Sequence, residues 1–437
     1  MTRNQRPTGD WVSSAIFIGL GGMLVLLPVQ FPVLPLNMSP VEVWNLLILP
    51  ILGLYAIRRG REIRLHYALT MWLILLGSLI GTGAASQPLN SFIAIVKDVY
   101  LYIWFVLVAA VFVSIRSERM RIVLRWWAAV AIAHGSLISI EFVFPQLYDQ
   151  MRNGLVRFGS LDAWRPSGLF ENANSAALYQ AMGLVPVALS GFPRWVTVAA
   201  AALVIFSIVA TGSLAATGGV IVGTLTALIG AMAFRPEPGG AKRLLRGLGL
   251  AGLLVGLLGG VVLSNADLSA RFAYSFYGRF QGSAEGRFSL WERAAEIFQA
   301  DVPPWGIGPD SYREFDVLRK PLHNDLLAFA IERGWLGLTG LVLLGASAWV
   351  GAFRLVRTRA GAPGWGGLGL AIFLLAVTAA MVHAQFHQIF HDRSVWLVLA
   401  TQQALLTKLA VDTGGARDAM VGGAASGRGA RAWSRLS

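Results

Sequence analysis

The chain has 437 residues, of which 55% are hydrophobic and only 14% are charged, and its mean hydropathy is +0.61. About a quarter of the residues of a soluble domain are charged, so this composition excludes an ordinary soluble protein and indicates one that crosses a membrane several times. The sequence has no cysteine, which excludes disulfides, zinc–thiolate sites, iron–sulfur clusters and cysteine nucleophiles.

Twelve apolar stretches are candidates for membrane-spanning helices. The hydrocarbon core of a bilayer is about 30 Å thick and needs roughly 20 apolar residues in a helix. The sequence therefore predicts an all-α polytopic membrane protein with about 12 transmembrane helices. The predicted spans are Trp11–Gln30, Val41–Ile57, His66–Gly81, Phe92–Ile115, Ile122–Phe144, Ser175–Ser190, Trp195–Thr211, Gly218–Phe234, Leu244–Leu263, Trp335–Phe353, Leu368–His383 and Val395–Leu409.

The net charge of +13 is explained by membrane topology, so nucleic acid is not an expected partner. Arginine and lysine gather in every second connecting segment, and the positive-inside rule assigns such segments to the cytoplasm. We therefore expect both termini to be cytoplasmic. The predicted domains are residues 1–263 with helices one to nine and an outer loop at 145–174, residues 264–334 as an outer loop subdomain, residues 335–411 with the last three helices, and residues 412–437 as a disordered cytoplasmic tail.

The segment 264–334 is too long for a simple connection and is not of low complexity. Loops longer than about 12–15 residues are usually functional or disordered. Within this segment, Ser289–Ala300 and Asn324–Ile331 carry apolar residues at helical spacing. We predict that the segment folds outside the cytoplasm as a subdomain of short helices.

A His-Asn pair begins the second of these predicted helices. Near the membrane surface, the neutral imidazole of His323 can accept a proton from a hydroxyl group. Asn324 is a good N-cap, and the helix N-terminus beside it favours an anion. The alternative is a histidine that only orders a loop.

The string RPSGLFENAN, residues 165–174, precedes the sixth predicted span. The asparagines Asn172 and Asn174 can cap a helix and also bind sugar hydroxyls. Arg165 has the planar guanidinium that grips a phosphate through two hydrogen bonds. The alternative is a capping segment with a surface arginine.

Four arginines follow in the long loop: Arg271, Arg279, Arg287 and Arg293. Several arginines above a membrane surface can hold a diphosphate headgroup and stabilise it as a leaving group. The alternative is local ion pairing, of Arg287 with Glu292 and of Arg293 with Glu296.

Polar residues inside the predicted spans are functional candidates by default. Lys97 and Asp98, near the outer end of the fourth span, could reach a lipid phosphate or pair with a neighbour. His134 and Glu141 share a face of the fifth span, where we predict a buried hydrogen-bonded pair in preference to a proton relay.

Two further groups of polar residues carry weaker signals. His383, His387 and His391 recur every four residues, which would align them on one helix face, but we predict no metal site there. Glu314 and Asp316 come nearest to the acidic pair that metal-dependent lipid-linked transferases usually carry. We predict that they are solvated surface residues.

Three strings together resemble the bacterial O-antigen ligases. His323-Asn324, nine residues, then Gly334-Trp335-Leu336-Gly337 matches the family pattern H-[N/S/Q]-x9-G-x-x-[G/T/Y]. RPSGLFENAN is similar to R-x-S-G-x-F-x-N-x-N, and GRFSLWERAAEIFQADVPPWGIGPD to R-x-x-x-W followed by P-x-x-G-x-G. The resemblance covers most of residues 41–411. O-antigen polymerases and protein O-oligosaccharyltransferases share the superfamily.

The resemblance implies transfer of a glycan from undecaprenyl diphosphate to a sugar hydroxyl of lipid A–core, on the periplasmic face of the bacterial inner membrane. It implies no metal and no cofactor. It makes His323 the general base and Arg165, Arg279 and Arg287 the diphosphate ligands, with Arg271 as a further candidate. In one departure, Leu214 stands where many members have an arginine, so another arginine such as Arg165 does that work, or the acceptor differs.

Other functions stay open. A polymerase or a protein-glycosylating enzyme of the same superfamily would differ only in its acceptor. A transporter of lipid-linked glycans would need a polar route at the middle of the bilayer, whereas the arginines and His323 gather at one membrane surface. A scaffold protein would not depend on His323.

Overall fold

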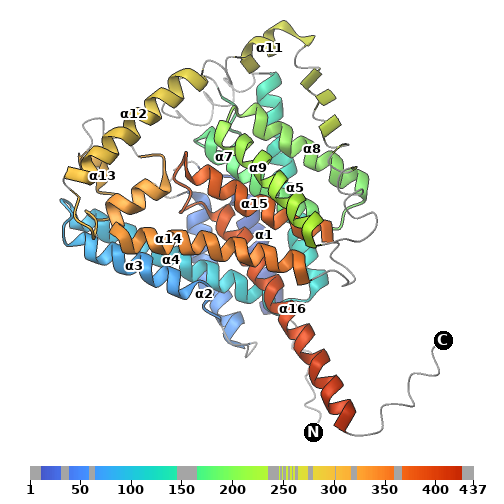
Figure 1. Cartoon of the computed structure of the whole chain (residues 1–437). Coiled ribbons are helices and arrows are strands. Elements are labelled where there is room, and N and C mark those ends of the chain that lie inside the picture. The colour runs from blue at the N-terminus through green and yellow to red at the C-terminus, as the bar shows by residue number, and fades with distance from the viewer. Residues whose placement is uncertain are drawn as a thin grey trace.

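The computed structural model describes residues 11–30, 39–58, 64–144, 165–234, 264–273, 279–300, 302–315, 322–358 and 367–425, with isolated positions between 246 and 260. All regular structure in this described part is helical (Figure 1). The helices are α1 (Trp11–Leu26), α2 (Pro40–Arg58), α3 (Ala68–Thr82), α4 (Pro88–Ser114), α5 (Ser117–Val143), α7 (Ala173–Leu189), α8 (Arg194–Ala210), α9 (Leu214–Phe234), α11 (Ala266–Ala273), α12 (Arg279–Ala300), α13 (Tyr312–Phe315), α14 (Asp325–Thr358), α15 (Gly367–Ala384) and α16 (Arg393–Ala425).

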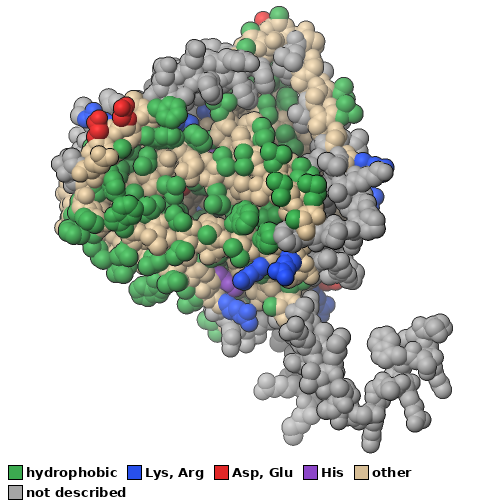
Figure 2. All heavy atoms as spheres, viewed as in Figure 1, with side chains coloured by type: hydrophobic (Ala, Val, Ile, Leu, Met, Phe, Trp, Pro, Cys, Tyr) green, Lys and Arg blue, Asp and Glu red, His purple; other side chains and the backbone are tan. Residues whose placement is uncertain are grey.

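The predicted all-α class is confirmed in the described residues, which are consistent with a helical membrane protein, and the count of about 12 transmembrane helices stays a prediction. Every predicted span except the ninth coincides with one of these helices; the ninth, Leu244–Leu263, lies outside the described residues apart from isolated positions. By length and composition, α2, α4, α5, α9 and α14 could each cross a membrane, and α1, α3, α8 and α15 are shorter apolar helices. Large apolar side chains cover the outer face of the bundle (Figure 2).

Small residues let several helices approach closely. A Cβ at Gly77 of α3 would lie 2.5 Å from the carbonyl oxygen of Arg333 in α14, and one at Gly219 of α9 would lie 2.8 Å from the carbonyl oxygen of Ala379 in α15. Inside a bilayer, helices gain no hydrophobic driving force by leaving lipid, so such close backbone packing is a main source of their association.

The long loop contains helices, as predicted. α12 includes Ser289–Ala300, and α12 and α13 lie beside the ends of α3 and α14, at the opposite end of the bundle from the projecting C-terminal part of α16 (Figure 1). Residues 145–164 of the shorter loop lie outside the described residues.

Two boundaries differ from the prediction. α14 begins at Asp325, ten residues before the predicted span at Trp335, because a kink joins the predicted loop helix to the membrane helix. α16 continues to Ala425, into the predicted disordered tail, since adding a residue to an existing helix costs far less than starting a new one. Residues 426–437 of that tail lie outside the described residues.

The kink in α14 is built from glycine. Gly334 has φ 62° and ψ −166°, a conformation that is nearly restricted to glycine. The kink frees the carbonyl oxygens of Ile331 and Glu332, which accept hydrogen bonds from the backbone N–H groups of Ile307 (3.0 Å) and Gly308 (2.8 Å). The backbone of the PPWGIGPD string thus satisfies the polar groups that a broken helix leaves open.

Candidate active site

His323 lies in a short segment directly before α14. It has φ 51°, and its half-buried ring stacks on that of His387, with ring centroids 5.7 Å apart and planes 13° from parallel. Asn324 caps α14 as expected, since its Oδ1 accepts a hydrogen bond from the Leu327 N–H at 3.0 Å. The indole of Trp291, from α12, donates to the carbonyl oxygen of Leu322 at 3.2 Å. The long loop and the start of α14 therefore fix the position of His323 together.

His387 belongs to the connection between α15 and α16, residues 385–392, which we call the His387 loop. Its Nε2 lies 3.5 Å from the Ser175 hydroxyl of α7, and its ring meets His383 edge to face at 5.7 Å. Burial first, and then electrostatic interaction with His323, Arg287 and Arg165, lowers the pKa of His387 to about 3. The ring is therefore neutral at physiological pH and lies in a cationic neighbourhood.

Three carboxylates hold the His387 loop in place. Asp325 accepts a hydrogen bond from the Ile389 N–H at 2.9 Å. Asp98 of α4 lies 2.7 Å from His391 Nε2, and Asp392 accepts from the Ser394 N–H at 2.8 Å, where α16 begins. The loop that carries His387 is thus fastened to α14, α4 and α16.

Arg165 joins the end of α8 to the start of α7. Its Nε donates to the carbonyl oxygen of Thr211 at 2.7 Å, after α8, and its terminal nitrogen donates to Asn174 Oδ1 at 3.1 Å, in α7. Asn172 caps α7 by accepting from the Asn174 N–H at 2.8 Å. Thr211 lies three residues before Leu214, so Arg165 reaches the turn at which the family pattern has its arginine.

Two side chains of α5 bind the backbone of the loop that carries Arg165. Glu141 Oε2 accepts from the backbone N–H groups of Ser167 (3.1 Å) and Gly168 (2.9 Å), and His134 Nε2 accepts from Leu169 (3.2 Å). His134 and Glu141 are buried, as predicted. Each accepts hydrogen bonds from the loop backbone, whereas we predicted a hydrogen bond between the two side chains. Together they shape the RPSGLF turn.

Arg287 reaches the site from α12 of the long loop. It lies half-buried on α12, and its charge acts on both His383 and His387. One turn further along α12, Trp291 packs against Phe386 with ring centroids 5.8 Å apart. The backbones of Arg271 and Arg279 lie in α11 and α12, but their side chains lie outside the described part, as do the side chain of Glu314 and the whole of Asp316.

A second cluster of charged residues escaped the sequence analysis in part. Asp98 forms a close ion pair with Arg333 of α14, which also donates to the Ser78 hydroxyl of α3 at 2.8 Å. The other oxygen of Asp98 faces His391, and the guanidinium lies 4.4 Å from the centre of the Phe329 ring. We call Asp98, Arg333 and His391 the charge cluster. A buried Asp98 should have signalled a cation partner, and Lys97 beside it is exposed.

The three histidines at four-residue spacing do not share a helix face. α15 ends at Ala384, so His387 and His391 lie in the loop, where one faces His323 and the other faces Asp98. In the part of the chain that the structure describes, no three histidines or acidic residues are grouped so that they could hold a metal ion.

His323 stacks on His387, and the charges of Arg165 and Arg287 act on the same His387 ring. An imidazole can take a proton from a hydroxyl, and guanidinium groups can stabilise a phosphate that leaves as an anion. The site is thus equipped for transfer from a phosphorylated donor, and it is assembled from α7, α12, α14 and the His387 loop.

One comparison with known proteins found a similar family. Residues 199–342 match the family model described as O-antigen ligase. The matched segment includes Arg287, His323 and the glycine kink, and Arg165 precedes it. No curated protein matches the chain. The match supports the resemblance to the O-antigen ligase superfamily that the sequence motifs indicate.

Proposed function

We propose that the protein is an O-antigen ligase that transfers a glycan from undecaprenyl diphosphate to a sugar hydroxyl of lipid A–core, at the periplasmic face of the inner membrane. The observation that carries the proposal is the convergence of one loop histidine and two arginines, His323, Arg165 and Arg287, around the buried ring of His387.

In the proposed reaction, His323 takes the proton of the acceptor hydroxyl as its oxygen attacks the anomeric carbon of the donor sugar. The bond between that carbon and the phosphate oxygen breaks, and undecaprenyl diphosphate leaves with the electron pair. Arg165 and Arg287 stabilise the negative charge that grows on the diphosphate. This chemistry needs no electron transfer, and every bond that forms is matched by one that breaks.

In this proposal, Arg165 supplies the positive charge of the arginine that many family members have at the position of Leu214. Its hydrogen bond to the Thr211 carbonyl holds the guanidinium at the turn between α8 and α9. The support of His134 and Glu141 for the RPSGLF turn gives this arginine a defined position. The departure from the family pattern would therefore move the cation to another loop without removing it from the site.

The test is transfer by purified protein in lipid nanodiscs, with undecaprenyl-diphosphate glycan, lipid A–core and a metal chelator. Capped lipid A–core is the expected product. Longer lipid-linked chains without capping would make the protein a polymerase, and modification of a protein hydroxyl would make it a protein-glycosylating enzyme. If the protein binds the donor but forms none of these products, the transporter hypothesis would be favoured.

His323→Ala should reduce capping about 100- to 10,000-fold, which is the range that general-base catalysis contributes. His66→Ala is the matched control, because His66 is a partly buried histidine that lies before α3, outside the candidate site. Equal thermal unfolding midpoints for the two variants would show that folding is intact. Wild-type capping by His323→Ala would overturn the general-base role.

A further inference from the structure

The proposed reaction gives His387 no role, although its ring stacks on that of the proposed base. The planes of His323 and His387 are within 13° of parallel, and the ring centroids are 5.7 Å apart. In the proposed reaction, His323 is positively charged for as long as it holds the proton of the acceptor hydroxyl. Its surroundings must therefore accept a neutral imidazole before the step and an imidazolium after it.

The two arginines of the site oppose a positive charge on the base. Arg165 and Arg287 act electrostatically on His387, and His323 stacks on the same ring. Like charges repel more strongly in a partly buried site than in water, so the arginines disfavour the imidazolium form of His323. A carboxylate often supports a histidine that acts as a base, but here it would also attract the guanidinium groups that the diphosphate needs.

A neutral aromatic ring meets both requirements. The face of such a ring attracts a cation that lies within about 6 Å of its centroid, and the separation of His323 from His387 falls within this distance. His387 has a pKa of about 3 and is therefore uncharged at physiological pH. It can stabilise a positive charge on His323 without competing with the diphosphate for the arginines.

We infer that His387 is a positioning residue for His323, whose ring face holds the base in place and stabilises the imidazolium that forms when the base takes a proton. The inference rests on the proposed function, because it takes His323 to be the base. The two stacked histidines have different roles because their surroundings differ, which is how acid–base groups in enzymes are usually separated.

Groups on several elements surround the His387 ring and fix its place. His383, in the last turn of α15, meets it edge to face with ring centroids 5.7 Å apart. The Ser175 hydroxyl of α7 lies 3.5 Å from its Nε2. Arg287 of α12 and Arg165, which precedes α7, are the arginines that act on it. The ring is therefore held by its neighbours as well as by its own backbone.

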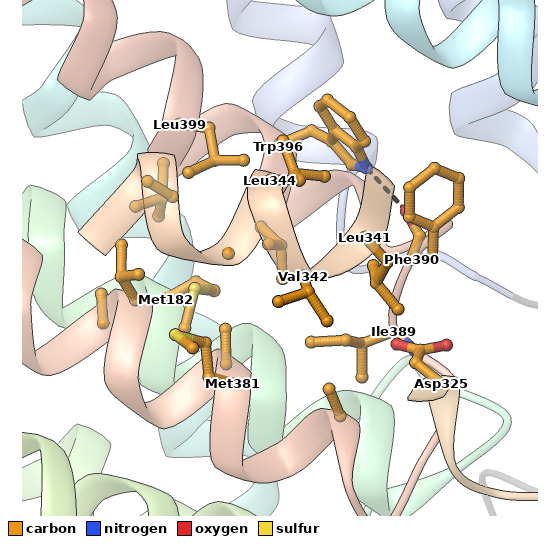
Figure 3. Close-up of a pocket in the computed structure, with 18 of the residues that line it drawn as sticks. Met182, Asp325, Leu341, Val342, Leu344, Met381, Ile389, Phe390, Trp396 and Leu399 are labelled. Atoms are coloured by element: carbon orange, nitrogen blue, oxygen red, sulfur yellow. Dashed lines mark hydrogen bonds between the residues drawn. The ribbon is translucent and has the colours of Figure 1, made fainter. Parts of the chain in front are cut away.

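The loop backbone after His387 is anchored to two helices. The Asp325 carboxylate of α14 accepts a hydrogen bond from the Ile389 N–H at 2.9 Å, and the Trp396 indole of α16 donates to the Phe390 carbonyl oxygen at 2.6 Å (Figure 3). Asp325 lies only two residues after His323. One hydrogen bond thus ties the segment that carries the base to the loop that carries the ring stacked on it.

The test compares variants of His387 in the full-length protein in lipid nanodiscs. His387→Phe keeps an aromatic face without ring nitrogens, whereas His387→Gln keeps hydrogen-bonding groups without an aromatic face. His387→Leu is a second variant that has no aromatic face. Diethyl pyrocarbonate modifies neutral imidazoles, so its rate of reaction at His323, followed by mass spectrometry between about pH 5 and 8, reports protonation of the base without any substrate.

The pH midpoint of the His323 reaction should be about 0.4–1.5 pH units lower in His387→Gln and His387→Leu than in wild type. This range is the free energy of a cation–π contact expressed as a change in protonation. The direction follows because loss of the aromatic face disfavours the imidazolium. His387→Phe should keep the wild-type midpoint. A wild-type midpoint in His387→Gln, or a shift in His387→Phe alone, would overturn the inference.

His391 is the internal control in every sample. It lies on the same loop, and its Nε2 is 2.7 Å from Asp98. A variant that displaces the loop should change the reaction of His391 together with that of His323, whereas loss of the stacked ring should change His323 alone. A joint change at both histidines in all three variants would overturn the inference and leave His387 as a structural part of the loop.

Transfer kinetics separate this inference from the proposed function. The kcat of His387→Gln should fall about 10-fold with little change in KM for the donor, because a displaced base slows the chemical step. His387→Phe should lose less. A higher KM with an unchanged kcat would make His387 a donor contact and overturn the inference. A shifted His323 midpoint in a protein that transfers no glycan would keep the stacked pair and refute the ligase.

Discussion

The charge cluster and the candidate active site both contact the His387 loop, yet they surround their arginines differently. In the charge cluster, the buried Arg333 faces the carboxylate of Asp98. In the candidate active site, Arg165 donates hydrogen bonds to the uncharged oxygens of Thr211 and Asn174. The first arrangement suits a permanent support of the fold, and the second holds a guanidinium at the turn between α8 and α9.

The difference also explains the two halves of the family motif. His323 and Asn324 belong to the candidate site, whereas Gly334 lies in the kink of α14 against Trp305, and Gly337 lies where α14 packs against α3. The motif thus joins one chemical group to the backbone geometry that holds it. Variants in the two halves should therefore fail in different ways.

The largest effect on folding should come from the charge cluster. Asp98→Asn leaves Arg333 buried without its counter-charge, and breaking a buried ion pair in this way costs about 3–5 kcal/mol. The midpoint of thermal unfolding of the purified protein measures the loss. Lys97→Ala is the matched control, because it removes the neighbouring charge from an exposed position of α4. Equal unfolding midpoints for the two variants would contradict a supporting role for the cluster.

A somewhat smaller loss should follow from Gly334→Ala. The backbone of Gly334 has a conformation that costs other residues about 1–3 kcal/mol, and a Cβ would lie 2.6 Å from the Trp305 Cα. Gly218→Ala in α9 is the control, since a Cβ there meets nothing within 4 Å. If Gly334→Ala unfolds at the wild-type temperature, the PPWGIGPD string is not the partner of the kink.

The opposite pattern, lost activity with intact stability, should follow from Arg287→Ala. A hydrogen bond from a cation to an anionic partner contributes about 1.5–3 kcal/mol, so the KM for the donor should rise about 10- to 100-fold while the unfolding midpoint changes little. Arg293→Ala, at an exposed position of the same helix, should keep donor affinity. Equal donor KM values for both variants would remove Arg287 from the site.

Sequence reasoning succeeded where structure depends on neighbouring residues. Apolar runs located the helices because each span must satisfy its own backbone hydrogen bonds in lipid, and Asn324 was identified as a cap from its place before Asp325. The pairing of Arg333 with Asp98 spans 235 residues, and the stacking of His323 on His387 joins two loops. Such contacts depend on how helices pack, and no local pattern encodes that packing.

The three histidines at four-residue spacing, His383, His387 and His391, also show that a local pattern does not predict helix packing. A four-residue spacing aligns side chains only while the helix continues, and α15 ends at Ala384. The end of the helix turns His387 toward His323 and His391 toward Asp98, so one local pattern supplies both regions compared above.

The smallest predicted effect is a dependence of stability on pH that His387 carries. Its pKa is about 3 in the folded protein and about 6.5 when unfolded, so below pH 6.5 the unfolded chain binds a proton that the folded protein does not. Stability should therefore fall by about 1.4 kcal/mol between pH 7.5 and 5.5. His387→Gln should remove that part of the decline, seen as a smaller shift of the unfolding midpoint than in wild type. The same shift in both proteins would mean that His387 is protonated in the folded state, and the cationic site would then hold one more charge.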